Sequence, residues 1–184
     1  MKKIFLMVLL LAVPGLAQAR DGFGVAYGIY NLEYNEPGLT QSGRPNGGYI
    51  SYFTDVSPYV GMELRYGVTG KSEKVYPATG NTLGFQMREF TSVLLKLMLP
   101  LSEGSRIYGT FGTTTATMER SSNVAVLNSM VSKTGLSYGG GVDFSMGTNL
   151  LLGAEWLSYW KNETVGTGMT FSFSGVNANI KMVF

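Results

Sequence analysis

The sequence predicts an all-β fold, an eight-stranded antiparallel up-and-down transmembrane β-barrel preceded by a cleaved signal peptide. Three observations predict it: a composition that favours strands, segments whose apolar residues recur with period two, and an alternating strand that runs to the last residue. The 184 residues include 25 glycines, 11 tyrosines and 10 phenylalanines, and only 14% of them are charged. Aromatic residues favour strands and glycine favours turns, so the composition indicates a β-rich chain.

The beginning of the chain has the pattern of a secretory signal peptide. Two lysines precede an apolar run over residues 4–13, and an A-x-A cleavage site ends at Ala19. The run has about ten residues, whereas a membrane-spanning helix needs roughly 20, which disfavours an anchor helix. We therefore expect a signal peptide over residues 1–19 and one barrel domain over residues 20–184.

Charge and cysteine content exclude several classes of protein. Without the two lysines of the leader, the 14 basic residues become 12 and balance the 12 acidic ones. A chain without a basic surplus has no electrostatic footprint for nucleic acid, so we expect no such partner. The sequence has no cysteine, so the exported protein must be stable without disulfides. In lipid, only a helix or a closed barrel pairs every backbone N–H and C=O group. No apolar run after the leader is long enough for a spanning helix, so a membrane protein of this sequence must be a closed barrel.

Eight segments are predicted as strands, and the connections between them alternate in length. The predicted strands are Gly22–Tyr34, Gly47–Asp55, Tyr59–Thr69, Phe85–Leu99, Arg106–Met118, Thr134–Ser145, Asn149–Trp160 and Met169–Phe184. The long connections cover residues 35–46, 70–84, 119–133 and 161–168, and short ones separate these pairs of strands. Outer-membrane barrels have short periplasmic turns and longer external loops, so both termini are expected on the periplasmic side.

The third segment shows best how the strands face. From Val60 to Tyr66 its even positions are apolar, whereas Glu63 and Arg65 lie at odd positions. In a membrane barrel the apolar face turns outward to lipid and the polar face turns inward. The segments 47–55 and 106–118 show no such division, so their facing stays open. The same parity through the other strands predicts an inward set of three acids and three bases: Glu63, Arg65, Lys96, Asp143, Glu155 and Lys181.

These six charges predict a closed lumen. Eight strands leave an interior just wide enough for side chains to fill, and an unpaired charge in it is costly. Balanced signs therefore predict a mutually paired network and no large water-filled pore. The alternative is a narrow, gated channel for small solutes or ions.

The residue types that the sequence lacks disfavour catalysis. Without histidine no Ser-His-Asp triad is available, and without cysteine as well the usual transition-metal ligands are lacking. Glu63 and Glu155 remain as a carboxylate pair of the kind used in glycoside hydrolysis, although a barrel interior needs charges for structural reasons alone. We expect no enzymatic activity, no cofactor and no metal site.

Aromatic residues gather where the membrane interfaces are expected. Barrels carry aromatic girdles at both headgroup levels, although any one of these residues is also an ordinary strand residue. The predicted outward aromatics are Tyr27, Trp156 and Trp160 near the external side and Phe23, Phe144 and Phe184 near the periplasmic side.

Two stretches carry a family resemblance. Residues 136–160, LSYGGGVDFSMGTNLLLGAEWLSYW, contain a Gly-x-Gly strand, a short turn and a strand with Glu155 before Trp156. This pattern resembles small bacterial outer-membrane β-barrels, the OmpA-like transmembrane domains and porin-family proteins. Residues 92–101, SVLLKLMLPL, are similar to the fourth strand and periplasmic turn of that family. The terminal Phe184 on an alternating strand resembles the signal that the barrel-assembly machinery recognises.

The resemblance implies an outer-membrane protein with a structural or surface-interaction role. Its partners are then outer-membrane lipid, lipopolysaccharide and, during biogenesis, the barrel-assembly machinery, and we expect a monomer. The external loops are the expected interaction surface for a ligand that the sequence does not name. Their charges either contact such a ligand or are simply solvated: Lys71, Glu73, Lys74, Glu119, Arg120 and Lys133. A soluble secreted barrel of lipocalin type is a further alternative.

Deletion of Phe184 tests the role of the chain end. We expect a marked loss of protein from the outer-membrane fraction, because the last residue both closes the barrel and, by resemblance, carries the assembly signal. Membrane fractionation followed by a gel of boiled and unboiled samples measures this, since a folded barrel migrates differently before boiling. Normal outer-membrane levels of the deletion variant would contradict the prediction.

Overall fold

The computed structural model describes residues 20–37, 39–76, 81–101, 104–123, 129–166 and 168–184. All regular secondary structure in these residues is β-strand. The expected signal peptide, residues 1–19, lies outside the described residues. No helix in the described part of the chain is long and apolar enough to cross a membrane.

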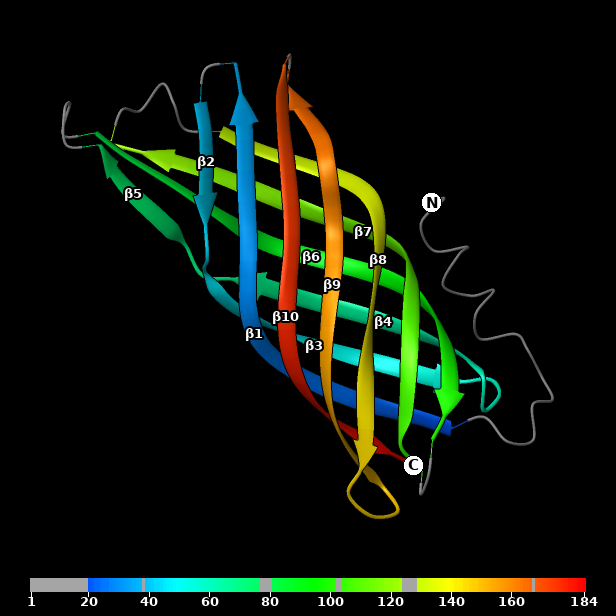
Figure 1. Cartoon of the computed structure of the whole chain (residues 1–184). Coiled ribbons are helices and arrows are strands. Elements are labelled where there is room, and N and C mark those ends of the chain that lie inside the picture. The colour runs from blue at the N-terminus through cyan, green and yellow to red at the C-terminus, as the bar shows by residue number, and fades with distance from the viewer. Residues whose placement is uncertain (1–19, 38, 77–80, 102–103, 124–128, 167) are drawn as a thin grey trace, which may run out of the picture.

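Ten strands form one sheet, and eight of them close into an antiparallel barrel (Figure 1). The strands are β1 (Arg20–Glu36), β2 (Leu39–Gly43), β3 (Asn46–Asp55), β4 (Val60–Thr69), β5 (Ser72–Tyr76), β6 (Asn81–Pro100), β7 (Arg106–Ser122), β8 (Ser129–Ser145), β9 (Leu150–Gly166) and β10 (Met169–Val183). Around the ring the order is β1, β3, β4, β6, β7, β8, β9 and β10, which pairs with β1. The predicted eight-stranded barrel is therefore confirmed.

Strands also occupy connections that the sequence predicts as loops. β2 pairs with residues 32–36 of β1, and β5 pairs with residues 81–85 of β6. The predicted loop 161–168 is mostly strand, because β9 runs to Gly166 and β10 begins at Met169. Backbone pairing continues at this end of the wall, where apolar side chains face inward and polar ones outward. This division is opposite to that of a lipid-facing strand, so counting for a lipid-facing pattern misses it.

Pairing between the first and last strands holds the end of the chain. The backbone N–H of Phe184 donates to the carbonyl of Asp21 at 3.0 Å. On the other side of β10, the N–H of Val183 donates to the carbonyl of Asn149 at 2.8 Å, and the Asn149 amide donates back to the Val183 carbonyl at 2.9 Å. The last residues therefore have partners on both sides, and closure leaves no free edge in the ring.

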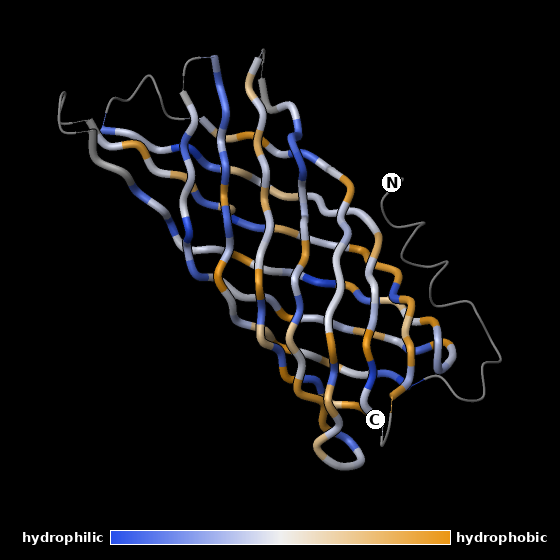
Figure 2. The backbone as a smooth tube through the Cα atoms, in the orientation of Figure 1, coloured by the Kyte–Doolittle hydropathy of each residue, from blue (hydrophilic) through white to orange (hydrophobic). Residues whose placement is uncertain are grey.

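The chemical character of the interior and of the outer wall inverts along β10. In the final part of β10, Ile180 and Met182 are half or more exposed on the outer wall, whereas Asn179 and Lys181 are buried in the lumen. Nearer the beginning of β10 the odd positions still face inward, but there they hold the buried rings of Phe171 and Phe173. Figure 2 shows apolar and polar residues alternating along the strands. The barrel thus has a polar interior where its outer wall is apolar, and an apolar interior beyond that band.

A β-bulge in β9 reverses the predicted facing of Trp160. Phe173 of β10 pairs with Trp160, but the next residue, Ser174, pairs with Ser158, so Tyr159 is an extra residue in β9. The extra residue reverses the side-chain parity. Trp160 consequently points inward, is fully buried, and donates from Nε1 to the carbonyl of Thr114 at 2.9 Å. The prediction that Trp160 faces outward is wrong, because counting by twos assumes an uninterrupted ladder.

The two tryptophans provide a test of this bulge. Trp156 is 46% exposed on the outer wall and Trp160 is 0% exposed. In vesicles with brominated acyl chains, we expect strong fluorescence quenching of the Trp160→Phe variant, which retains Trp156, and weak quenching of the Trp156→Phe variant. Equal quenching of the two variants would place Trp160 on the lipid face.

Candidate functional site

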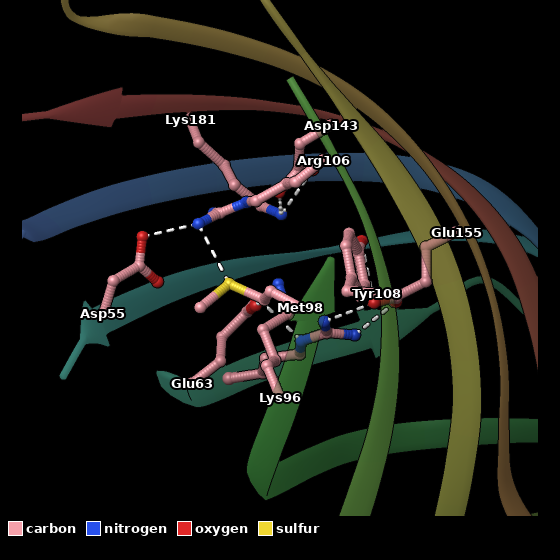
Figure 3. A network of polar contacts seen from close by, with 10 residues as sticks. Asp55, Glu63, Lys96, Met98, Arg106, Tyr108, Asp143, Glu155 and Lys181 are labelled. Carbon is pink, nitrogen blue, oxygen red and sulfur yellow. Dashed lines mark hydrogen bonds and ion pairs between the residues drawn. The ribbon is translucent and has the colours of Figure 1, made fainter. Parts of the chain in front are cut away.

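The six charged residues predicted to face inward lie together in the lumen (Figure 3). None is more than 2% exposed. They come from β4, β6, β8, β9 and β10, whose alternation places every second side chain inside the barrel. The set is Glu63, Arg65, Lys96, Asp143, Glu155 and Lys181.

Arg65 is the centre of a first group of four charges. Its two terminal nitrogens donate to the two carboxylate oxygens of Glu155 at 2.5 and 2.7 Å, and its Nε donates to Glu63 Oε1 at 2.8 Å. Lys96 Nζ lies 2.5 Å from Glu63 Oε2. The bidentate contact uses the planar fork of the guanidinium, which a lysine does not offer. This group therefore contains two acids and two bases.

A second group of four charges lies toward the short turns after β3 and β6. Lys181 Nζ lies 2.9 and 3.1 Å from the two carboxylate oxygens of Asp143. Arg106 Nε donates to Asp143 Oδ2 at 2.9 Å, and a terminal nitrogen of Arg106 donates to Asp55 Oδ2 at 2.5 Å. This group also contains two acids and two bases, so the whole lumen network is neutral.

Tyr108 joins the two groups. The ammonium of Lys96 lies 4.1 Å from the centre of its ring, and that of Lys181 lies 5.1 Å from it. Its hydroxyl donates to Glu155 Oε2 at 3.3 Å. An aromatic face attracts cations, so Tyr108 keeps two like charges near each other while it binds a carboxylate.

Sequence reasoning missed Asp55, Arg106 and Tyr108. They lie in β3 and β7, the two strands whose facing the sequence does not declare. The six predicted charges already sum to zero, so charge balance did not require more. One signal was available, because Arg106 and Asp143 are opposite charges that face each other directly across β7 and β8.

A cluster of aromatic rings fills the lumen on the external side of the charges. Tyr159 stacks on Phe173 with ring centres 4.5 Å apart, and Phe90 contacts Tyr159 at 5.1 Å. Gly67 makes room for one of these rings, since a Cβ there would overlap the ring of Phe90. We call this cluster the aromatic plug, and its members are Tyr30, Tyr34, Phe85, Phe90, Tyr159, Trp160, Phe171 and Phe173.

The predicted interface aromatics, with Trp160 excepted, lie on the outer wall. Tyr27, Phe144 and Trp156 are all exposed there. Phe23 contacts Phe184 with ring centres 5.7 Å apart and Tyr52 at 5.4 Å, which makes an aromatic group where the chain ends. Their role as membrane girdles stays a prediction.

Several of the predicted loop charges have partners within the chain. Lys71 and Glu73 form an ion pair, Glu119 accepts a hydrogen bond from Gln86, and Arg120 donates to the hydroxyl of Tyr34. Such pairs fit the alternative of a solvated loop better than a surface held open for a ligand. The other two are Lys133, which lies in β8, and Lys74, whose side chain lies outside the described residues.

The two lumen glutamates contact cations through all four of their carboxylate oxygens. Glu63 has one oxygen on Arg65 and the other on Lys96, and both oxygens of Glu155 are on Arg65. Four cation contacts therefore occupy the oxygens of the two carboxylates. Among the described residues no three His, Cys, Asp or Glu side chains are grouped as metal ligands.

Comparisons with known proteins agree with this architecture. A family model described as the outer membrane protein β-barrel domain matches residues 4–184. No curated protein matches the chain in a sequence comparison.

Solved structures of small outer-membrane barrels have a similar fold. The attachment invasion locus protein Ail of Yersinia pestis is 16% identical with a TM-score of 0.59, covering 91% of this chain and 99% of Ail. Neisserial surface protein A is 13% identical with a TM-score of 0.62, covering 88% of this chain and 97% of that protein. The N-terminal β-barrel domain of Pseudomonas aeruginosa OprF is 15% identical with a TM-score of 0.55, covering 88% and 97%.

Substitution of Arg65 tests the network. Arg65→Met leaves Glu155 without its cation and Glu63 with only Lys96, and we expect the free energy of unfolding to fall by about 3–5 kcal/mol. Urea unfolding of the protein in lipid vesicles measures this. A second variant, Arg65→Met with Glu155→Gln, also removes the unpaired carboxylate. It is expected to recover part of the lost free energy of unfolding.

The matched control is Lys71→Met, which breaks a partly exposed ion pair with Glu73. Exposed pairs contribute roughly 0–1 kcal/mol, so this variant is expected to unfold almost like the parent protein. Equal destabilisation by the two single substitutions would contradict a special role for the lumen network.

Proposed function

The chain belongs to the family of the outer membrane protein β-barrel domain, and we propose that it is a barrel with a closed lumen whose external face serves a structural or surface-interaction role. The protein lies in the bacterial outer membrane, as the family and the barrel neighbours indicate. What is proposed beyond this is the closed state and the use of the external face.

The observation that carries the proposal is a pair of obstructions in series along the lumen. The neutral charge network crosses the barrel from β4 to β9 through Arg65 and Glu155. Beyond it the aromatic plug is fully or almost fully buried. A hydrated ion must break ion pairs at the first and displace packed rings at the second, and both steps are costly.

The external end supports a surface role by its construction. β6, β7 and β9 extend well beyond the apolar band, and β2 and β5 add to the wall. Paired backbone gives these ends a rigid form, and rigid scaffolds position binding loops. Ail has been crystallised with the heparin analogue sucrose octasulfate, which shows that this ligand binds that protein.

We also propose the biogenesis that the sequence predicts. Residues 1–19 direct export and are removed, the barrel-assembly machinery recognises Phe184, and the folded protein is a monomer in contact with outer-membrane lipid and lipopolysaccharide. The aromatic contact between Phe23 and Phe184 supports a structural contribution of the last residue besides the assembly signal.

A narrow channel is the second candidate, favoured by polar groups at the other end of the lumen. A pocket of about 560 Å³ opens beside the short turns and is lined by Arg20, Asp55 and Arg106, among others. Among the described residues, the side-chain polar atoms of Ser51, Asn177 and others in the lumen are buried without a hydrogen-bond partner. These groups favour a polar vestibule that opens at the short turns and leads to the charge network.

Planar-bilayer recording separates the two candidates. We expect no reproducible conductance steps from the parent protein, because the plug stays closed. Lys96→Met and Glu155→Gln are expected to remain silent as well, since neither substitution touches the plug. Gel migration before and after boiling verifies that each variant is folded. Reproducible steps in the parent protein that either substitution abolishes or alters would overturn the closed lumen and favour the channel.

A further inference from the structure

A shallow depression lies on the outer wall where β1, β9 and β10 run side by side. Its volume is about 300 Å³. Apolar side chains line one part of it and polar side chains line the other. The apolar part contains Ile29, Trp156 and Val176, and the polar part contains Asn31, Arg44 and Ser174.

Strand register shows that the two parts meet at a sharp boundary. Val176 pairs with both Trp156 and Ile29, so these three side chains form one row across the strands. All three are largely exposed on the outer wall. Ser174 and Asn31 pair in the next outward row, two residues further along the same strands. The wall therefore changes from apolar to polar within one row, which marks the edge of the hydrocarbon layer.

Arg44 provides a cation at this boundary. It is exposed, and among the described residues no acid forms an ion pair with it. Its neighbour Pro45 accepts a hydrogen bond from the N–H of Tyr30 at 2.9 Å, which holds this segment beside β1. A guanidinium binds phosphate through two parallel hydrogen bonds and is weakly hydrated, so it suits a phosphate at a membrane surface.

Trp156 provides a flat apolar surface next to the polar row of Asn31 and Ser174, on its periplasmic side. It is about half exposed, and its ring contacts Tyr138 edge-on with centres 6.2 Å apart. Indole rings favour the headgroup level of a bilayer. The polar row and the cation thus lie on the external side of the indole, as the headgroup and phosphate of a phospholipid lie on the outer side of its acyl chains.

We propose that the depression is a binding site for a phosphorylated lipid of the outer leaflet, specifically lipid A of lipopolysaccharide. Arg44 binds a phosphate of lipid A, and Asn31 and Ser174 supply hydrogen bonds. An acyl chain lies over Trp156, Val176 and Ile29. Charge complementarity selects this occupant, because the site pairs one uncompensated cation with an apolar floor. The proposal rests on the proposed contact with lipopolysaccharide and does not depend on whether the lumen is closed.

The test compares lipid retention by two arginine variants of the intact protein. The protein is placed in phospholipid nanodiscs, diphosphorylated lipid A is titrated, and bound lipid is counted by native mass spectrometry after transfer to detergent. We expect Arg44→Ala to lower the apparent affinity roughly fivefold to tenfold, the effect of losing one charge-assisted phosphate contact. Arg88→Ala is the matched control, because Arg88 is an exposed arginine on β6, across the ring from β10.

Two further arms identify the chemistry. Lipid A without its phosphates is expected to bind the parent protein as weakly as diphosphorylated lipid A binds the Arg44→Ala variant. Phosphatidylglycerol, which has a phosphate and only two acyl chains, is expected to bind more weakly than lipid A. Equal loss in the Arg44 and Arg88 variants, no loss in either, or tight binding of dephosphorylated lipid A would each overturn the proposal.

Discussion

The interior of the barrel depends on the ion pair between Arg65 and Glu155. The two residues lie on β4 and β9, which are opposite each other in the ring with three strands between them on either side. Their two short hydrogen bonds therefore cross the lumen and fix its width at this level. A slip of either strand by one residue would turn its charge toward lipid, so the pair also fixes register.

The charged side chains in the lumen require space and partners from the residues around them. Lys181 reaches the network from β10, next to β1, and β1 has Gly24 at this level. A Cβ on Gly24 would lie 3.1 Å from Cγ of Lys181, so the glycine leaves the space that the lysine stem needs. Tyr108 serves a related purpose, because its ring accepts two cations that would otherwise face each other. The charges of the network balance one another, so each member is costly to remove alone.

Period-two counting predicted the ring and placed six interior charges, because alternation is a direct consequence of strand geometry. It failed where other factors act. Trp160 lies beyond a bulge, and nothing local in the sequence marks the extra residue Tyr159. Asp55 and Arg106 belong to strands rich in threonine, glycine and tyrosine, which suit either face. β2 and β5 are stabilised by backbone pairing, which leaves no apolar pattern to read.

The inversion along β10 connects these features. Beyond Gly175 toward the external end, the interior holds Phe171 and Phe173 and the outer wall is polar, as in a water-soluble barrel; on the other side the interior holds Lys181 and the outer wall is apolar. The external half thus buries apolar side chains away from water, and the other half buries charged side chains away from lipid. The aromatic plug is therefore the core of a part that stands in water, and the charge network is the core of a part that stands in lipid. Stability of the external part then comes from its own packing, which supports the proposed surface role.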